Sequence, residues 1–311
     1  MIGKRLFDRV MSAEEFSPLY TRNPAANITG KEVAQIWKGN MRDAQVFEIT
    51  PTAEYFYAGT DQEEWDVFHD FPSLLPPYDN LWMEYTPPPT VRSNGNIKPF
   101  NTGGLQLKTG ISIQTSESRK GHPLHPDVEF RAQMMQVFLE QNGRLLGPSM
   151  HACWMVDGAG KAFSLSGAGE KILFTAVGAA QTEATVAQQQ DYMTMGYPAL
   201  LAISFLNCRN TVVVDHRPDQ KLSKVHQKRH GRPLTTFKTL EISQVKKLLN
   251  ETKAMGVLEL KHALHLCRGH FKNYNERPLF GRHKGMFWWG PTIRGTGPNA
   301  VIKDYAVKGG A

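Results

Sequence analysis

Hydrophobic and polar positions near the start of the chain follow a helical period. Residues 12 to 40 predict two helices, one starting near Ser12 and the other at Thr29. Thr29 and Glu32 have the spacing of a capping box, in which each side chain binds a backbone N–H group that the first helical turn leaves without a partner. The next residues, 44 to 57, are rich in β-branched and aromatic side chains, so we expect a strand there.

The middle of the chain has the alternating pattern of an antiparallel sheet. Residues 105 to 115 predict a strand that is broken or bulged at Gly110. Residues 128 to 139 predict a longer strand that ends at Asn142-Gly143, a dipeptide suited to the positive φ angles of a tight hairpin turn. Another strand at 150 to 156 ends at a second glycine-rich turn, so two hairpins follow one another.

The pattern then returns to helix. Residues 179 to 207 are rich in good helix formers, and we expect a helix broken at Gly196-Tyr197-Pro198. A short apolar strand at 211 to 214 follows. The proline-rich stretches 60 to 78 and 86 to 104 predict extended connections.

Charge divides the chain into two parts. Residues 216 to 311 carry 19 Lys and Arg against 6 Asp and Glu, whereas residues 1 to 215 carry 17 against 23. We therefore expect an α+β protein with a larger, acidic mixed domain that contains an antiparallel sheet (1 to 215). A basic C-terminal unit of a helix and a small curved antiparallel sheet (216 to 311) would follow. Basic surfaces attract polyanions, and nucleic acid is the commonest of these.

The first basic stretch is HRPDQKLSKVHQKRHGRPL, at 216 to 234. In a helix over 219 to 230, lysines at positions i, i+3 and i+7 lie on one face, at the spacing needed to follow a phosphate backbone. The candidate nucleic-acid-binding residues here are Arg217, Lys221, Lys224, Lys228, Arg229 and Arg232. A solvated helix between two domains would have the same composition, so both interpretations stay open.

A second group of candidates lies between residues 261 and 308, where histidines are concentrated. His270 and His283 are candidates for the acid and the base of metal-independent RNA cleavage, because imidazole titrates near neutral pH. Arg268 and Lys272 would then stabilise the charged transition state. Imidazoles that only face an anion would have the same composition.

The same segment also allows a weaker zinc hypothesis. Cys267 and His270 have C-x-x-H spacing, and His283 or His265 could complete a set of ligands. A second C-x-x-C pair is absent from the sequence. We therefore expect no metal and no cofactor, and interpret Cys267 as a small buried hydrophobic residue.

Two adjacent indoles, Trp288 and Trp289, complete the set. Neighbouring side chains of a strand point to opposite faces, so one indole could be buried while the other stacks on a base. Both could equally anchor a small barrel. The remaining candidate nucleic-acid-binding residues are Arg282, Lys284, Trp288, Trp289 and Arg294.

Several short motifs resemble an uncharacterised group of proteins encoded by bacteriophages and prophages. The resemblance is concentrated in the last third of the chain. The motifs are Leu206-Asn207-Cys208, Lys224 with Lys228 to Leu234, Cys267 to Lys272, Phe287-Trp288-Trp289 and Ile293-Arg294-Gly295. It implies a phage or mobile-element context and assigns no catalytic residue.

Three classes of function fit these observations. The first is a phage accessory protein that binds RNA or DNA, with a metal-independent endoribonuclease as its enzymatic variant. The second is a structural or assembly component of the virion, and the third is an inhibitor that binds a host protein. Three cysteines in unrelated contexts favour a reducing compartment, and no apolar run is long enough for a membrane span. We expect a cytoplasmic protein of the infected host, or a virion component, without a membrane partner.

Overall fold

The fold class is α+β, as the sequence predicts. The computed structural model describes residues 5–16, 29–59, 66–93, 96–99, 107–148, 151–164, 175–177, 183–242, 265–267, 269–290 and 292–294. Among these residues, no helix combines the length and the apolar content needed to cross a bilayer.

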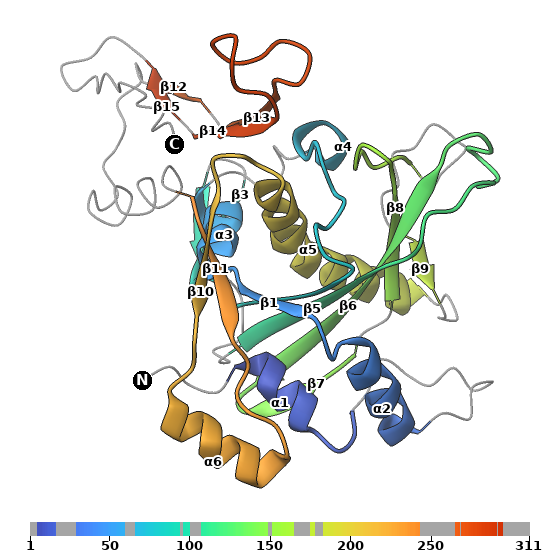
Figure 1. Cartoon of the computed structure of the whole chain (residues 1–311), viewed down its shortest axis with the longest axis vertical. Coiled ribbons are helices and arrows are strands. Elements are labelled where there is room, and N and C mark those ends of the chain that lie inside the picture. Colours follow the sequence, from blue (N-terminus) through green and yellow to red (C-terminus); the bar gives the residue numbers. More distant parts are fainter. Residues whose placement is uncertain are drawn as a thin grey trace.

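A mixed nine-stranded sheet forms the centre of the protein (Figure 1). In order across the sheet, its strands are β10 (Val212–His216), β11 (Phe237–Glu241), β1 (Gln45–Glu48), β2 (Asn80–Tyr85), β5 (Leu107–Thr115), β6 (Phe130–Gln141), β8 (His151–Asp157) and β9 (Thr175–Val177), and β7 (Arg144–Leu146) also pairs with β6. β1 is parallel to both of its neighbours, β11 and β2, and the other pairs are antiparallel.

Among the described residues, three two-stranded sheets accompany the large one. They are β3 (Thr90–Ser93) with β4 (Asn96–Pro99), β12 (His265–Cys267) with β15 (Thr292–Arg294), and β13 (His270–Asn273) with β14 (Met286–Trp289). The first lies within the stretch 86 to 104, which the sequence predicts to be an extended connection.

Helices cover both faces of the large sheet. One face carries α3 (Thr50–Glu54), the π-helix η1 (Tyr55–Gly59) and α5 (Glu183–Leu206), and the other carries α1 (Leu6–Ser12) and α2 (Gly30–Asn40) (Figure 1). Because side chains alternate along a strand, Leu81 and Met83 of β2 enter the first core and Trp82 enters the second. The other helices of the described residues are α4 (Val67–Asp70) and α6 (Gln220–His230).

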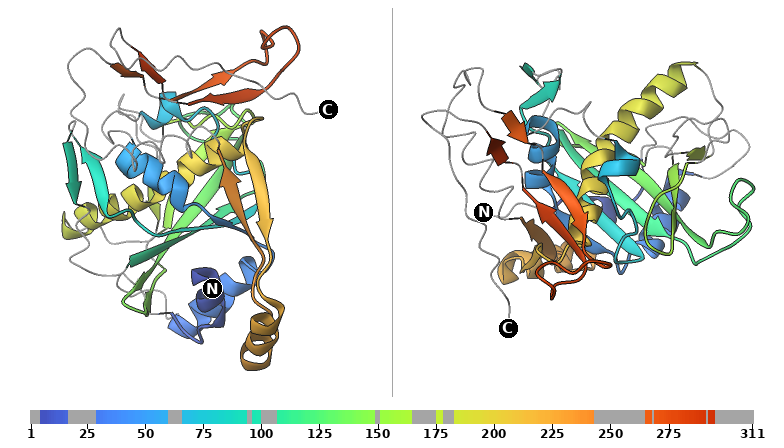
Figure 2. Two further views of the ribbon diagram at one scale, coloured as in Figure 1. Left: turned by 90° about the vertical axis from the view of Figure 1, so that its left-hand side faces the viewer. Right: turned by 90° about the horizontal axis from the view of Figure 1, so that it is seen from above.

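The sheet does not end at the expected boundary between residues 215 and 216. That boundary falls inside β10, which pairs with β11, and β11 pairs in turn with β1 from the N-terminal part of the chain. The helix and the small sheet expected to form one C-terminal unit also lie apart. In two perpendicular views, α6 and the β13–β14 hairpin are at opposite ends of the molecule (Figures 1 and 2).

Local signals in the sequence are confirmed where they act over a few residues. The capping box at Thr29 and Glu32 forms at the start of α2. The turn at Asn142-Gly143 joins β6 to β7, with φ angles of 49° and 79°.

Two predictions about the N-terminal elements are wrong. The first helix, α1, ends at Ser12 instead of starting there. The strand expected over 44 to 57 stops after β1, because Pro51 is in the first turn of α3.

β5 is not interrupted at Gly110. Its register with β6 is continuous from Leu107 to Thr115. A Cβ atom at Gly110 would lie 2.2 Å from Cζ2 of Trp82, so glycine is needed to make room for the indole ring on the neighbouring strand. The glycine that suggested a bulge therefore reflects packing between strands.

The predicted break at Pro198 is also wrong, because α5 runs through it as one helix. A proline has no N–H group, so the carbonyl of Thr194, four residues earlier, loses its helical partner. The hydroxyl of Tyr57 donates to that carbonyl at 3.3 Å, and the hydroxyl of Tyr85 donates to the carbonyl of Met195 at 2.8 Å. Burial raises the pKa of Tyr85 to about 12, so its hydroxyl keeps its proton at neutral pH.

We expect Tyr85→Phe to lower the free energy of unfolding by about 1–3 kcal/mol. The reason is that the partly buried carbonyl of Met195 would lose the hydroxyl that donates to it. Urea unfolding measures the change. Tyr78→Phe is the matched control, because Tyr78 is 38% exposed, and it should shift stability by less than about 0.5 kcal/mol. Equal stability of the two variants would contradict a stabilising role for the hydrogen bond between Tyr85 and Met195.

Candidate nucleic-acid interface

The basic stretch after β10 forms the predicted helix, α6. Its start is fixed by Asp219, whose carboxylate accepts hydrogen bonds from the backbone N–H groups of Lys221 at 2.8 Å and Leu222 at 3.0 Å. Its end is fixed by Gly231, which has a φ of 73° and donates its N–H to the carbonyl of Gln227. These are common helix caps, so the ends of α6 are set by residues next to it in sequence.

Four basic side chains of α6 point to solvent, and we call them the α6 cationic face. They are Lys221, Lys224, Lys228 and Arg229. His226 is 6% exposed and lies on the side of the helix opposite the three lysines. Within the part of the chain that the structure describes, none of the four has an ion-pair partner. The three lysines share an exposed face of α6, which is the arrangement that their spacing predicts.

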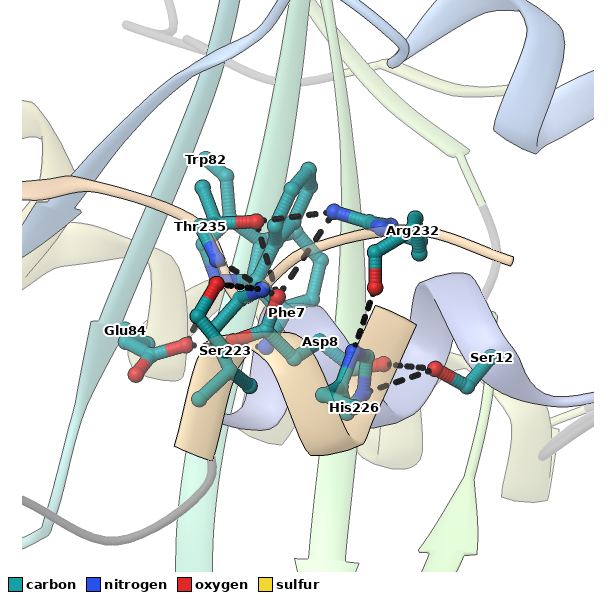
Figure 3. A network of polar contacts seen from close by, with 10 residues as sticks. Phe7, Asp8, Ser12, Trp82, Glu84, Ser223, His226, Arg232 and Thr235 are labelled. Atoms are coloured by element: carbon teal, nitrogen blue, oxygen red, sulfur yellow. Dashed lines mark hydrogen bonds and ion pairs between the residues drawn. The ribbon is translucent and has the colours of Figure 1, made fainter. Parts of the chain in front are cut away.

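A polar network holds the buried side of α6 against α1 (Figure 3). Asp8 is 1% exposed, and its carboxylate accepts hydrogen bonds from the backbone N–H of Thr235 at 3.1 Å and from the hydroxyl of Thr235 at 2.8 Å. His226 donates from Nδ1 to the carbonyl of Arg232 at 2.9 Å, and its Nε2 lies 3.5 Å from the hydroxyl oxygen of Ser12. The helix is therefore fixed at both its middle and its C-terminal end.

A second buried carboxylate, Glu84, lies next to this network (Figure 3). It accepts hydrogen bonds from the backbone N–H of Phe7 at 3.0 Å and the indole N–H of Trp82 at 2.9 Å, and it pairs with Arg5 at 3.3 Å. Burial raises the pKa of Glu84, and these three donors oppose that rise. The guanidinium of Arg5 also lies 3.3 Å from the ring centre of Phe237 in β11. This cluster joins α1 to the sheet.

Arg232 is half-buried, with 25% of its side chain exposed, and it pairs with other groups of the protein instead of pointing to solvent as its predicted role requires. Its guanidinium lies 3.6 Å from the carboxylate of Asp8 and donates to the hydroxyl of Thr235 at 2.7 Å. Burial lowers the pKa of Arg232, and Asp8 acts against that change. Arg217, in contrast, is exposed in the connection between β10 and α6, so it can extend the α6 cationic face.

Trp288 is also a core residue. It is 1% exposed and packs against Phe205, Tyr55 and Phe271, with ring centres 5.0, 5.9 and 4.5 Å away. The side chain of Asn210 accepts from its backbone N–H at 3.0 Å and donates to its carbonyl at 2.8 Å. Trp288 therefore cannot stack on a nucleic-acid base, and the hydrophobic-anchor interpretation describes it.

Two residues of the predicted motif, Gly269 and Phe271, contribute to the same packing. A Cβ atom at Gly269 would lie 2.2 Å from Cζ2 of Trp288, so only glycine fits there without a shift. Phe271 contacts the same indole. Trp289 is half-buried on the other face of β14, and Nζ of Lys272 lies 5.6 Å from its ring centre. Within the described part of this motif, the glycine and the phenylalanine have structural roles.

The structure does not bring His270 and His283 together as an acid and base pair. His270 pairs with Trp289 at one end of the β13–β14 hairpin, and His283 lies in the connecting loop beyond the other end, where Asn273 pairs with Met286. A strand advances about 3.3 Å per residue, so about 10 Å of strand separates His270 from the start of the loop. Both histidines are exposed, as is Lys272, while Arg268 lies outside the described residues.

The described residues contain no group of three or more His, Cys, Asp or Glu side chains placed to hold a metal ion. The side chains of His265 and Cys267 lie outside the described set, although both residues belong to β12. Arg294 belongs to β15, where it pairs with His265, and its side chain is likewise outside that set.

Arg282 and Lys284 are exposed in the loop of the β13–β14 hairpin. This loop and helix α6 are at opposite ends of the molecule (Figure 2). The exposed candidates among the described side chains thus form two separate basic surfaces. Sequence reasoning missed the aromatic residue that accompanies the second one, Phe280, which is 73% exposed. Its position between Leu279 and Gly281, in a loop with three basic residues, was the available signal.

Comparison with known proteins adds no assignment: the chain matches no protein-family model and no curated protein sequence.

Proposed function

We propose that the protein binds nucleic acid through the α6 cationic face. The observation that carries the proposal is that Lys221, Lys224, Lys228 and Arg229 are all exposed, on a helix whose ends and buried side are fixed. A rigid helix presents its charges at constant spacing, so a phosphate backbone can meet several of them without ordering a flexible segment. The motif resemblance adds a phage or mobile-element setting, and with it the cytoplasm of an infected host.

The proposed function is binding without catalysis. An acid and a base that act together must both lie within hydrogen-bond distance of the reacting groups of one substrate. His270 and His283 lie at different ends of their hairpin. An endoribonuclease mechanism using these two histidines therefore has no support from the geometry. The α6 cationic face needs no reaction to explain its exposure.

Replacing Lys221, Lys224 and Lys228 with glutamine should make binding to DNA weaker and less sensitive to salt. Each phosphate contact contributes about 0.7–0.9 to the slope of log K against log salt concentration, so we expect a slope smaller by about 2 to 3. Titrations between about 50 and 200 mM salt measure it. Stability should stay within about 0.5 kcal/mol, because the three side chains are solvated.

The control variant removes the same charge from another surface. Lys108, Lys120 and Lys161 are also exposed, on β5 and in two loops outside α6, and their replacement with glutamine should leave the slope nearly unchanged. If both triple variants lose the same affinity, net charge alone drives binding and α6 is not the contact surface. Binding that does not depend on salt would contradict the proposal as a whole.

A further inference from the structure

The loop between β13 and β14 has a well-defined turn at its tip. Leu279 and His283 exchange two backbone hydrogen bonds, at 2.9 and 3.0 Å, which close the turn. Inside it, the N–H of Gly281 donates to the carbonyl of Pro278 at 3.0 Å and the N–H of Arg282 donates to that of Leu279 at 3.1 Å. These bonds fix the backbone on both sides of Phe280.

Phe280 has an unusual conformation and exposure for an aromatic residue. Its φ angle is 53°, in the left-handed region that is unfavourable for bulky side chains. It is also the most exposed large hydrophobic side chain among the described residues, at 73%. A ring in this position adds little to the core, and the turn that holds it there is unfavourable for it. The ring therefore contributes little to stability, and a role in binding another molecule explains its presence better.

The loop that carries Phe280 is rich in positive charge. Arg277, Arg282 and Lys284 are exposed in the same loop, and Glu276 is its one acidic residue. In the region that the structure describes, these three cations have no ion-pair partner. The tip thus combines a free aromatic face with neighbouring cations. An unpaired nucleotide offers the complementary groups, a base that can stack and a phosphate that can pair.

We infer that this hairpin tip binds single-stranded nucleic acid, with Phe280 stacking on an unpaired base and Arg277, Arg282 and Lys284 facing the phosphates. The inference rests on the proposed function and adds the class of ligand. A duplex is the poorer partner, because its bases are already stacked on one another and expose only their edges in the grooves. The tip lies at the opposite end of the molecule from α6, so the two surfaces can be altered independently (Figures 1 and 2).

The test compares an oligothymidylate of about eight nucleotides with a DNA duplex of about eight base pairs, by fluorescence anisotropy on the full chain; a single strand of this length suits an aromatic binding site. Phe280→Asn removes the ring with a residue that tolerates positive φ better, so backbone strain does not explain a loss. We expect this variant to bind the single strand roughly tenfold more weakly and to keep the wild-type salt slope, because no charge is removed. Its affinity for the duplex should stay within about twofold.

Two further variants complete the design. Phe280→Trp keeps an aromatic face and should retain the affinity for the single strand. Leu124→Asn removes another exposed loop hydrophobe, 43% exposed, and should change neither affinity. Unchanged single-strand binding by Phe280→Asn, or an equal loss on both probes, would overturn the inference.

The outcomes also separate this inference from the proposed function. If the triple lysine variant of α6 loses duplex affinity while Phe280→Asn loses none for the single strand, the inference fails and the proposed function stands. If the wild-type protein binds neither probe, both fail. Vesicles of phosphatidylcholine with phosphatidylserine test a membrane role for the ring. Loss of vesicle binding by Phe280→Asn, with unchanged oligonucleotide affinity, would also overturn the inference.

Discussion

Trp288→Ala should lower the free energy of unfolding by about 3–5 kcal/mol, the range for removing a large aromatic ring from a core. Trp288 is 1% exposed and packs against Phe205 of α5, Tyr55 of η1 and Phe271 of β13. Its removal would leave a cavity at the point where the C-terminal hairpin joins the large core. Urea unfolding followed by circular dichroism measures the loss.

Two variants show whether packing is the cause. Trp288→Phe keeps most of the ring and removes an indole N–H that has no partner among the described residues, so it should cost clearly less than Trp288→Ala. Trp289→Ala acts on a half-buried ring and should cost about 1 kcal/mol. A Trp288→Ala protein with wild-type stability and weakened DNA binding would show that the ring acts on nucleic acid after all.

The predictable parts of the structure are those in which the deciding residues are neighbours in sequence. Asp219 and Gly231 cap α6 within one turn of its ends, and the spacing of the three lysines decides that they share a face. The turn at Asn142-Gly143 depends only on the φ angles of two residues. Such signals require no knowledge of the rest of the fold.

The wrong predictions share a different cause, a partner far away in sequence. Pro198 breaks no helix because tyrosines from η1 and β2 satisfy the carbonyls of the preceding turn. Gly110 makes room for the ring of Trp82 and does not form a bulge. Arg232 belongs to a basic run, but Asp8, more than two hundred residues earlier, pairs with it. A single sequence does not show these partners.

The candidate site was predictable to the same degree. Exposure of the α6 lysines follows from helical spacing. The burial of Trp288 depends instead on Phe205 and Asn210, which lie about eighty residues earlier in the sequence. Composition made the histidine-rich segment look catalytic. The hairpin register places the two candidate histidines apart. His270 is the first residue of β13, whereas His283 lies in the loop that follows the last residue of β13.

Asp8→Ala should destabilise the protein by about 3–5 kcal/mol and loosen α6. Asp8 is almost fully buried, accepts two hydrogen bonds from Thr235 and lies 3.6 Å from the guanidinium of Arg232. Its removal would leave a partly buried cation without its carboxylate, together with two donors that lose their acceptor, and breaking a buried pair on one side is costly for that reason. Denaturant unfolding gives the magnitude.

The effect on α6 can be followed separately by hydrogen exchange. Because Asp8 holds the segment that follows the helix, amides from Lys221 to Arg229 should exchange faster in Asp8→Ala, as local opening becomes easier. Asp215→Ala is the matched control, since its side chain is 63% exposed and pairs with Lys238 at the surface, where such pairs contribute about 0–1 kcal/mol. Slow exchange in α6 of the Asp8→Ala protein would mean that the packing of His226 alone fixes the helix. The α6 cationic face would then keep its geometry without the buried carboxylate, and DNA affinity in Asp8→Ala would match that of the wild type.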